Sequence, residues 1–200
     1  MPKFVYLASQ SPRRRQLLEQ LGVAYELLLP EPHEDAEALE AVLPGEAPLT
    51  YVQRVTALKL DAALTRRRQR GLPPAPVLCS DTTVALGHTI FGKPMDAPDA
   101  ERMLQTLSGK THVVLTAVAL GTARKRVQVL SRSRVTFGAM SDAQIKAYVA
   151  SGEPMGKAGA YAVQGRAAAY IADLHGSYTG IMGLPLFETA NALRTLGFKV

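Results

Sequence analysis

The spacing of apolar residues predicts that the chain opens with a strand, a turn, a helix and a second strand. Residues Lys3–Ala8 alternate and are rich in Val, Phe and Tyr, which is typical of a strand. Pro12 then occupies a position where helices commonly begin, and an apolar stripe at helical spacing follows it as far as Gly22. A second strand is expected at Val23–Leu29. The Pro- and Glu-rich stretch Pro30–Pro48 is expected to be a long loop, and such loops in compact domains are usually functional.

The middle of the chain alternates between helical and extended patterns. Apolar residues at helical spacing predict a helix over Leu49–Arg70, which closes at Gly71 before two prolines. The elements expected next are a buried strand at Val77–Leu86, a tight hairpin into Thr89–Phe91, a helix at Ala97–Leu107, and strands at Thr111–Leu120 and Arg126–Phe137. Because the last two strands are joined near Gly121, they should pair antiparallel.

The C-terminal third begins with a helix signal and predicts an α/β fold. Ser141, followed three residues later by Gln144, is typical of an N-cap with a variant of the capping box. Beyond this helix we expect short strands at Ala160–Gln164 and Ala168–Leu174, on either side of Gly165, and a last helix at Pro185–Leu196. Hairpins are incompatible with a purely parallel sheet, so the predicted fold class is α/β with a mixed sheet.

The composition is that of a globular protein in a reducing compartment. With 47% hydrophobic and 20% charged residues, the 200-residue chain can form one domain, 1–200, around its own core. The single cysteine, Cys79, lies in an apolar run, which excludes a disulfide framework and favours a buried residue. The apolar stretch before Ser9 is too short for a signal peptide, and no run approaches a membrane span. We therefore expect a cytoplasmic protein without a membrane partner.

A net charge of +6 raises the question of a nucleic-acid partner, because Lys and Arg supply the phosphate contacts of such complexes. Much of the excess lies in Arg66, Arg67, Arg68 and Arg70, which favours a solvated helix end stabilised by the helix dipole. The chain has no Trp and only 6% aromatic residues, so platforms for stacking single-stranded bases are scarce. The sequence therefore disfavours a nucleic-acid partner.

The segment Ser9–Arg15 is a candidate phosphate-binding element. It places two serines and three arginines in the turn between a strand and a helix N-terminus. Unpaired backbone N–H groups and the positive helix end attract anions there, and arginine forks bind phosphate oxygens in pairs. Exposed helix surface is the alternative, but Arg13–Arg15 lie where the helix dipole disfavours positive charge, and a bound anion would explain them.

A near match to the Walker P-loop occurs at Gly87–Pro94 and is rejected. Pro94 has neither the hydroxyl that a P-loop places on Mg²⁺ nor a backbone N–H, and the segment has the pattern of a hairpin. Lys93 remains a candidate phosphate ligand, because Pro94 would hold it rigidly near the strand that carries Asp81.

Asp81 and Glu34 are the candidate ligands of a metal ion. Asp81 follows an apolar run, and a carboxylate at a strand end in an α/β fold commonly faces a ligand crevice, although it can equally be a cap. Glu34 is one of six acidic residues between Glu31 and Glu46 and is less specific. Mg²⁺ takes one or two carboxylates with waters and phosphate oxygens, which this pair could supply. The four histidines lack paired spacing for zinc.

Two further candidates depend on their surroundings. Lys59 lies within the expected helix Leu49–Arg70, where a solvated lysine is the ordinary occupant. The glycine-dense stretch 151–165 has the pattern of a ligand-facing loop in which small residues permit close backbone approach. Gln164 could contact a base edge, because its amide both donates and accepts hydrogen bonds.

These segments resemble the Maf family of nucleotide pyrophosphatases, also known as septum-formation inhibitor proteins. The resemblance runs from Leu7 nearly to the C-terminus. It rests on LASQSPRRRQLL, on SDTTVAL with GKPMDAPDAERMLQTLSGKTHVVLTAVAL, on YVASGEPMGKAGAYAVQG, and on GSYTGIMGLPLFET. Several long motifs in this order are far more specific than any one alone. The resemblance implies a two-lobed α/β fold with an elongated sheet and a central cleft, related to the inosine-triphosphate pyrophosphatases.

The resemblance also implies a catalytic set and a substrate. By position, the family's functional residues correspond to Ser9, Arg13, Arg14, Glu34, Lys59, Asp81, Lys93 and Gln164. Arg13, Thr82 and Gln164 look like the branch that prefers dTTP and UTP, with Mg²⁺ or another divalent cation such as Mn²⁺ on Glu34 and Asp81. The chain departs from the family at Gly156, where Asp usually precedes the lysine. Family members often form homodimers, but no stripe in this sequence marks an interface.

Two other readings stay open at this point. The nearest is the same chemistry on 7-methyl-GTP or on a deaminated purine triphosphate such as inosine triphosphate. The other is a regulatory protein of cell division, or a basic nucleic-acid binder, whose binding would depend steeply on salt and which would show no Mg²⁺-dependent hydrolysis.

Overall fold

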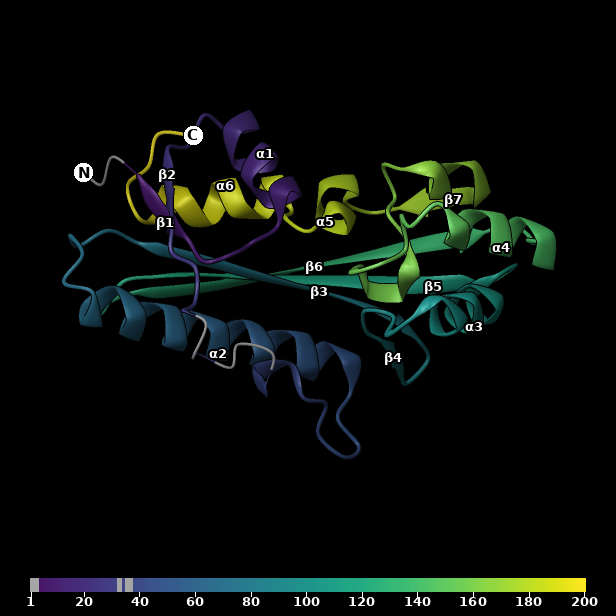
Figure 1. Ribbon diagram of the computed structural model, residues 1–200. Coiled ribbons are helices and arrows are strands. Elements are labelled where there is room, and N and C mark those ends of the chain that lie inside the picture. Colours follow the sequence, from purple (N-terminus) through teal and green to yellow (C-terminus); the bar gives the residue numbers. More distant parts are fainter. Residues whose placement is uncertain (1–3, 32–33, 35–37) are drawn as a thin grey trace.

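The computed structural model describes residues 4–31, 34 and 38–200. Its strands form one sheet whose longest members run the length of the molecule (Figure 1). The strands are β1 (Val5–Leu7), β2 (Tyr25–Leu27), β3 (Val77–Leu86), β4 (Thr89–Phe91), β5 (Thr111–Gly121), β6 (Arg126–Phe137) and β7 (Ile171–His175). Lys3 of the expected first strand, and residues 32–33 and 35–37 of the expected long loop, lie outside the described residues.

Helices flank this sheet on both sides. The α-helices are α1 (Pro12–Gln20), α2 (Pro48–Gln69), α3 (Ala97–Leu107), α4 (Asp142–Ala150), α5 (Tyr178–Met182) and α6 (Leu186–Thr195). Short 3₁₀ turns are η1 (Ala38–Glu40), η2 (Ala158–Ala160) and η3 (Arg166–Tyr170). Across the described part of the chain, no helix combines the length and the apolar character needed to cross a membrane.

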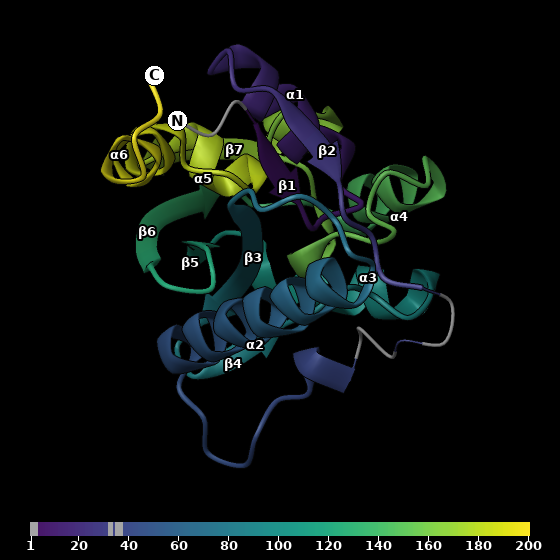
Figure 2. The ribbon, with the colours of Figure 1, turned by 90° about the vertical axis from the view of Figure 1, so that its left-hand side faces the viewer.

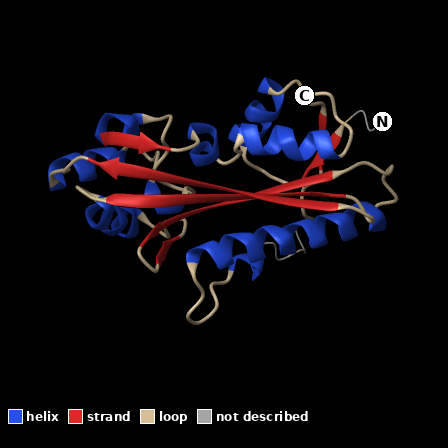
Figure 3. Cartoon of the chain, turned by 180° about the vertical axis from the view of Figure 1, so that it is seen from behind, coloured by secondary structure: helices blue, strands red, loops and turns tan. Residues whose placement is uncertain are grey.

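The sheet changes from parallel to antiparallel pairing at β3. The strand order is β2-β1-β3-β5-β6-β7, and β4 pairs with β3 in addition. β1 runs parallel to β2 and β3, and pairs with β3 only where Tyr6 lies opposite Val77 and Leu7 opposite Leu78. β3, β5 and β6 form a long antiparallel ribbon, seen from behind in Figure 3. The predicted fold class, α/β with a mixed sheet, is therefore confirmed.

Helices cover both faces of the sheet around β3. α2 lies along one face, and α1, α5 and α6 lie on the other, as the two views in Figures 1 and 2 show. An apolar cluster that includes Leu17, Leu78 and Leu193 joins α1 and α6 to the sheet. A second cluster under α2 includes Leu60 and Cys79, and Cys79 is fully buried, as expected. Because both faces are packed, the strand edges are where a ligand can reach β3.

Local sequence signals set the ends of several helices. Pro12 and Pro48 are the first residues of α1 and α2, a position where the missing N–H has no partner to lose. Ser141 accepts a hydrogen bond from the Gln144 N–H, and the Gln144 side chain accepts one from the Ser141 N–H. The predicted capping box therefore opens α4.

The sequence-based prediction was wrong for one strand and missed one helix. The strand expected at Ala160–Gln164 is a turn, and the strand expected from Ala168 begins at Ile171, after η3. Tyr161 and Val163, which lie in the strand expected at Ala160–Gln164, are buried in the core, but their backbone does not pair with any neighbouring strand that the structure describes. α5 was missed because its five residues are too few to show a helical period.

The far end of the sheet contains a buried histidine. His112 on β5 is 1% exposed, and its Nε2 lies 2.8 Å from the hydroxyl oxygen of Tyr161. The rings of Phe137 and Tyr161 pack edge-on against the imidazole. Burial lowers the pKa of His112 to about 4, well below its ordinary value of 6.5. The folded protein therefore keeps this histidine neutral in mildly acidic solution.

We predict that His112 makes the protein less stable in mild acid. In the unfolded chain His112 takes up a proton as the pH falls below 6.5, whereas in the folded protein it does so only at about pH 4. The contribution of neutral His112 to the free energy of unfolding is therefore complete above pH 6.5 and is lost as the pH falls toward about 4. In His112→Phe, the fall in the free energy of unfolding between about pH 7 and about pH 5 should shrink by about 2 kcal/mol. Urea denaturation at both pH values measures this. The exposed His88, replaced by Gln, is the control and should keep the wild-type fall. An unchanged fall in His112→Phe would contradict the account.

Candidate functional site

The candidate site is a stretch of β3 without a partner strand on one edge. On that edge, β1 pairs with β3 only as far as Leu78, and β4 pairs from Val84 onward. Among the described residues, positions 79–83 have no strand partner there, while their other edge pairs with β5. A cavity of about 730 Å³ opens along this gap, and Asp81 lies at the middle of it. Asp81 is thus inside β3, not at a strand end as expected, and the early end of β1 is what exposes it.

The side chains of β3 alternate between the two sides of the gap, as the pleat of a strand requires. Asp81 points toward α2, where its Oδ1 lies 2.5 Å from Nζ of Lys59. Ser80 points the other way and donates to the carbonyl oxygen of Gly183 at 2.8 Å. Thr82 lies on the same side as Ser80 and faces Arg14 of α1. The cavity therefore receives side chains from both helical layers.

Arg14 joins the N-terminal segment to the gap in the sheet. Its Nε donates to the carbonyl oxygen of Gly183 at 2.9 Å, and its Nη1 donates to Oγ of Ser9 at 3.1 Å. Its Nη2 lies 3.5 Å from Oγ1 of Thr82. Burial lowers the pKa of Arg14, while the charge of Asp81 acts in the opposite direction. These partners are neutral oxygens, and Nη1 and Nη2 each carry a second N–H that can bind an anion.

Arg13 and the first turn of α1 add to this anion-binding character. Nε of Arg13 donates to the carbonyl oxygen of Met182 at 3.3 Å, and burial lowers the pKa of Arg13. The helix begins after Ser11 with no side-chain cap, so its first N–H groups are open to a ligand. Ser9, Arg13 and Arg14 line the cavity, and the structure thus brings the predicted phosphate-binding residues together.

Two lysines approach the gap from the opposite side. Nζ of Lys59, on α2, lies between Asp81 and Oε1 of Glu40, which it reaches at 2.7 Å. Nζ of Lys93, in the loop after β4, lies 3.4 Å from Oε2 of the same Glu40. Lys59 is largely buried, so it is not the solvated lysine that its helical position alone favours. Sequence analysis missed Glu40, because nothing in its spacing separates it from the other acidic residues of its loop.

Glu34 and Asp81 are held in separate ion pairs. Arg66 donates to both carboxylate oxygens of Glu34, at 2.8 Å from Nε to Oε1 and 2.6 Å from Nη2 to Oε2, and Arg70 lies 3.9 Å away. The hydrogen bond from Arg66 is the main cause that lowers the pKa of Glu34 to about 2. Among the described residues, those lining the cavity include Arg66 and Glu40 but not Glu34. The metal role of Glu34 stays a prediction, and the structure does not place it beside Asp81.

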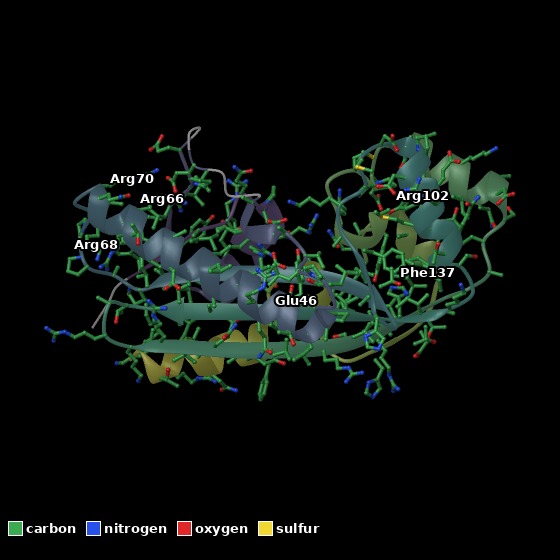
Figure 4. All side chains as sticks on the ribbon, turned by 90° about the horizontal axis from the view of Figure 1, so that it is seen from below. Glu46, Arg66, Arg68, Arg70, Arg102 and Phe137 are labelled. Atoms are coloured by element: carbon green, nitrogen blue, oxygen red, sulfur yellow. The ribbon has the colours of Figure 1, made fainter. Side chains whose placement is uncertain are left out.

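The arginines near the end of α2 are not all solvated. Arg66, labelled in Figure 4 with Arg68 and Arg70, is 6% exposed and also donates to the carbonyl oxygen of Leu28. Arg67 donates to the carbonyl oxygen of Ala75. The prediction of a wholly solvated helix end was therefore wrong for Arg66, because this arginine turns inward to hold the segment after β2.

The glycine-dense loop closes the other end of the cavity. Gly159 has a φ of +68°, and a Cβ there would lie 2.8 Å from Cγ1 of Val84 on β3. Its N–H donates to the carbonyl oxygen of Gly92, which ties the loop to the segment carrying Lys93. Gln164 is exposed and lines the cavity, as does Lys157. The loop therefore approaches β3 as closely as its small residues allow, in agreement with the sequence analysis.

The carboxylate of Glu153 holds the loop in shape. It accepts hydrogen bonds from the Tyr148 hydroxyl and from the N–H groups of Arg166 and Ala167. A Cβ at Gly165 would lie 2.3 Å from Oε1 of Glu153. A side chain at position 165 would therefore push this carboxylate away from its donors, next to Gln164 in the chain.

Fold and site together define a class of protein. Arg13, Arg14, Lys59 and Lys93, with Ser9 and an open helix start, surround the largely buried carboxylate of Asp81 at a gap in a mixed sheet. Arginine forks and a helix N-terminus are suited to phosphate groups, and a carboxylate among them is suited to a metal ion that arrives with phosphate. The protein is thus an α/β protein whose site has the side chains that suit a polyphosphate.

Comparison with known proteins identifies the family. The model of the family described as Maf-like protein matches residues 4–196, and the chain belongs to this family. It is 74% identical, over the full length of both chains, to the dTTP/UTP pyrophosphatase of Albidiferax ferrireducens. It is also similar to the proteins of the same name from a Polaromonas species (68% identity) and Cupriavidus metallidurans (64%), over 98% of each chain. The predicted family is therefore confirmed.

We predict that Gly165→Ala loosens the loop that carries Gln164. The added Cβ would displace the Glu153 carboxylate from its three donors, so the free energy of unfolding should fall by about 1–3 kcal/mol. Gly138→Ala is the matched control, because a Cβ there meets nothing closer than 3.7 Å, an ordinary contact. Urea denaturation of both variants measures the difference. Equal stability of the two variants would show that the Glu153 clamp does not hold this loop.

Proposed function

We propose that this protein hydrolyses dTTP and UTP to the nucleoside monophosphate and pyrophosphate with the help of a divalent cation. The observation that carries the proposal is the convergence of Arg13, Arg14, Lys59 and Lys93 around Asp81 in one cavity. The relatives named dTTP/UTP pyrophosphatase align over the whole chain, so the substrate class follows from them. The reaction breaks the bond between the α-phosphorus and the oxygen that bridges it to the β-phosphate.

The triphosphate lies, in this proposal, along the unpaired edge of β3. Arg13 and Arg14 bind phosphate oxygens from the α1 side, with Ser9 and the first N–H groups of α1. Lys59 and Lys93 bind from the α2 side. Together these cations neutralise the negative charge that builds up on the departing pyrophosphate.

Asp81 is the residue we assign to water activation. Its Oδ1 is bound by Lys59, and within the described part of the chain its Oδ2 has only a long contact, 3.5 Å, with the Thr83 hydroxyl. Oδ2 is therefore available to a water molecule or a metal ion. A carboxylate is a weak base, so a bound divalent cation would help by acidifying the attacking water and polarising the α-phosphate.

The described residues fit a cation that arrives with its substrate. Within the described ranges, no group of three or more His, Cys, Asp and Glu side chains is placed to hold a metal by itself. Mg²⁺ commonly binds through one or two carboxylates and completes its shell with waters and substrate phosphates. We propose Asp81 as the carboxylate. A second ligand at Glu34, which the family resemblance implies, requires its ion pair with Arg66 to open.

The base end of the cavity is where we place pyrimidine selection. Gln164 can donate to and accept from a base edge, and it lines the same cavity as Thr82 and Arg13, which the family resemblance also links to the choice of base. The cytoplasmic location, the homodimer and the division of domain 1–200 into two lobes stay predictions.

A substrate panel tests the proposed function. The purified protein should release pyrophosphate from dTTP, UTP and 5-methyl-UTP in the presence of Mg²⁺, and should lose this activity with a chelator. Coupled detection of pyrophosphate measures the rates. If 7-methyl-GTP or ITP is the better substrate, pyrimidine selection is wrong, and if no triphosphate is hydrolysed, the proposal fails as a whole.

We predict that Asp81→Asn abolishes turnover while nucleotide still binds. The amide is isosteric but cannot take up a proton, and a loss of about 10²–10⁴-fold in kcat is expected for a group that transfers the proton of the attacking water. Asp61→Asn is the control, because Asp61 pairs with Arg126 outside the cavity. Near-normal turnover of Asp81→Asn would remove Asp81 from the chemistry.

A further inference from the structure

An acidic side chain already occupies the phosphate end of the cavity. Glu40 ends the turn η1 and lines the cavity. Its carboxylate bridges the two lysines assigned to phosphate, at 2.7 Å from Lys59 and 3.4 Å from Lys93. Each of its oxygens faces one lysine, which is how two oxygens of a phosphate group would be bound. The Glu40 carboxylate therefore occupies the position in which a phosphate group would bind the two lysines.

Contacts outside the carboxylate hold this segment in place. The carbonyl oxygen of Glu40 accepts a hydrogen bond from the Tyr51 hydroxyl at 2.9 Å. The next carbonyl, that of Ala41, accepts from Nη2 of Arg54 at 2.8 Å. Because α2 fixes the backbone, the carboxylate can leave the lysines without unfolding the turn. Its side chain is 29% exposed, so solvent is within reach of the displaced group.

The charge balance around Glu40 favours the pair when the cavity holds no ligand. Burial by itself would raise the pKa of Glu40, but the charges of Lys59 and Lys93 and their hydrogen bonds lower it. Glu40 is therefore ionised at neutral pH and neutralises part of the positive charge of the site. A nucleoside triphosphate carries several negative charges and can replace one carboxylate, whereas a weakly charged anion replaces it less readily.

We propose that Glu40 is an internal counter-ion that competes with the substrate's phosphates for Lys59 and Lys93. The proposal rests on the proposed function for the nature of the anion, and it makes Glu40 a residue that tunes affinity instead of a catalytic one. Polyphosphate binds the form of the site in which Glu40 is displaced from the two lysines. The apparent affinity for polyphosphate is therefore the intrinsic affinity of that form multiplied by the fraction of molecules in that form. This competition also favours release of pyrophosphate after the reaction, because the carboxylate is at hand to replace it.

If Glu40 instead bound a metal ion, Glu40→Gln would change the affinity for phosphate in the opposite direction. A metal ligand strengthens the binding of a metal–phosphate complex, and its neutral amide variant would weaken it. A competing carboxylate weakens binding of the phosphate itself, and the amide variant would strengthen it even when no metal is present.

Titration calorimetry with inorganic pyrophosphate, in a chelator, tests the competition. Glu40→Gln should bind pyrophosphate about 3–10-fold more tightly than the wild-type protein, because the competing charge is gone. Glu31→Gln is the matched control: it removes the same charge from the same segment, but Glu31 pairs with Arg70 outside the cavity. It should bind like the wild type. Glu40→Ala removes the carboxylate in another way and should change affinity in the same direction as Glu40→Gln.

The kinetic readout separates this proposal from the proposed function. With dTTP and Mg²⁺, Glu40→Gln should lower KM while kcat stays the same or falls through slower product release. Equal or weaker pyrophosphate binding by both Glu40 variants, including no binding by any of the proteins, would overturn the role of Glu40. Absence of dTTP hydrolysis by the wild-type protein would instead overturn the proposed function, whatever the titrations show.

Discussion

The ion pair between Lys59 and Asp81 is the contact on which the arrangement of the site depends. It links α2 to the stretch of β3 that, among the residues the structure describes, has no strand partner on the cavity side, at 2.5 Å and with both side chains largely buried. Removing two charges from water is costly, and a buried pair is weak evidence for stability. The pair is better explained as a preset charge balance: Lys59 holds the Asp81 carboxylate in place, and Asp81 holds a lysine inside a cavity that also contains Arg13, Arg14 and Lys93.

The sheet provides this opening because β1 is short. Had β1 continued past Leu7 beside β3, its backbone would have filled the edge at which Asp81 is reached. The chain leaves the sheet after Leu7. Ser9 and the two arginines Arg13 and Arg14 of α1 then lie on one side of the gap. The loop 151–165 approaches the other end, where only a glycine fits at position 159 against Val84. A polyphosphate site therefore arises where strand pairing is interrupted between two packed helical layers.

Much of the fold, and part of the site, could be predicted from the sequence. β3, β6 and α3 begin and end where predicted, because apolar periodicity is strong in long elements and proline, glycine and capping residues mark their ends. Arg14, Lys93 and Asp81 were predicted as site residues because local pattern and family resemblance agree on them, and all three line one cavity. The partners of Glu34 and Glu40 could not be predicted, since they depend on how an acidic loop folds over α2. Arg66 was misjudged for the same reason, because helical spacing says nothing of a side chain that turns inward to meet a distant carboxylate.

The most direct test of this account is a crystal structure with a non-hydrolysable α,β-methylene analogue of dTTP and Mg²⁺. The account predicts that the phosphates lie along residues 79–83 of β3, with Arg13 and Arg14 on one side, Lys59 and Lys93 on the other, and the base toward Gln164. Phosphates bound elsewhere, with these four cations uncontacted, would contradict it.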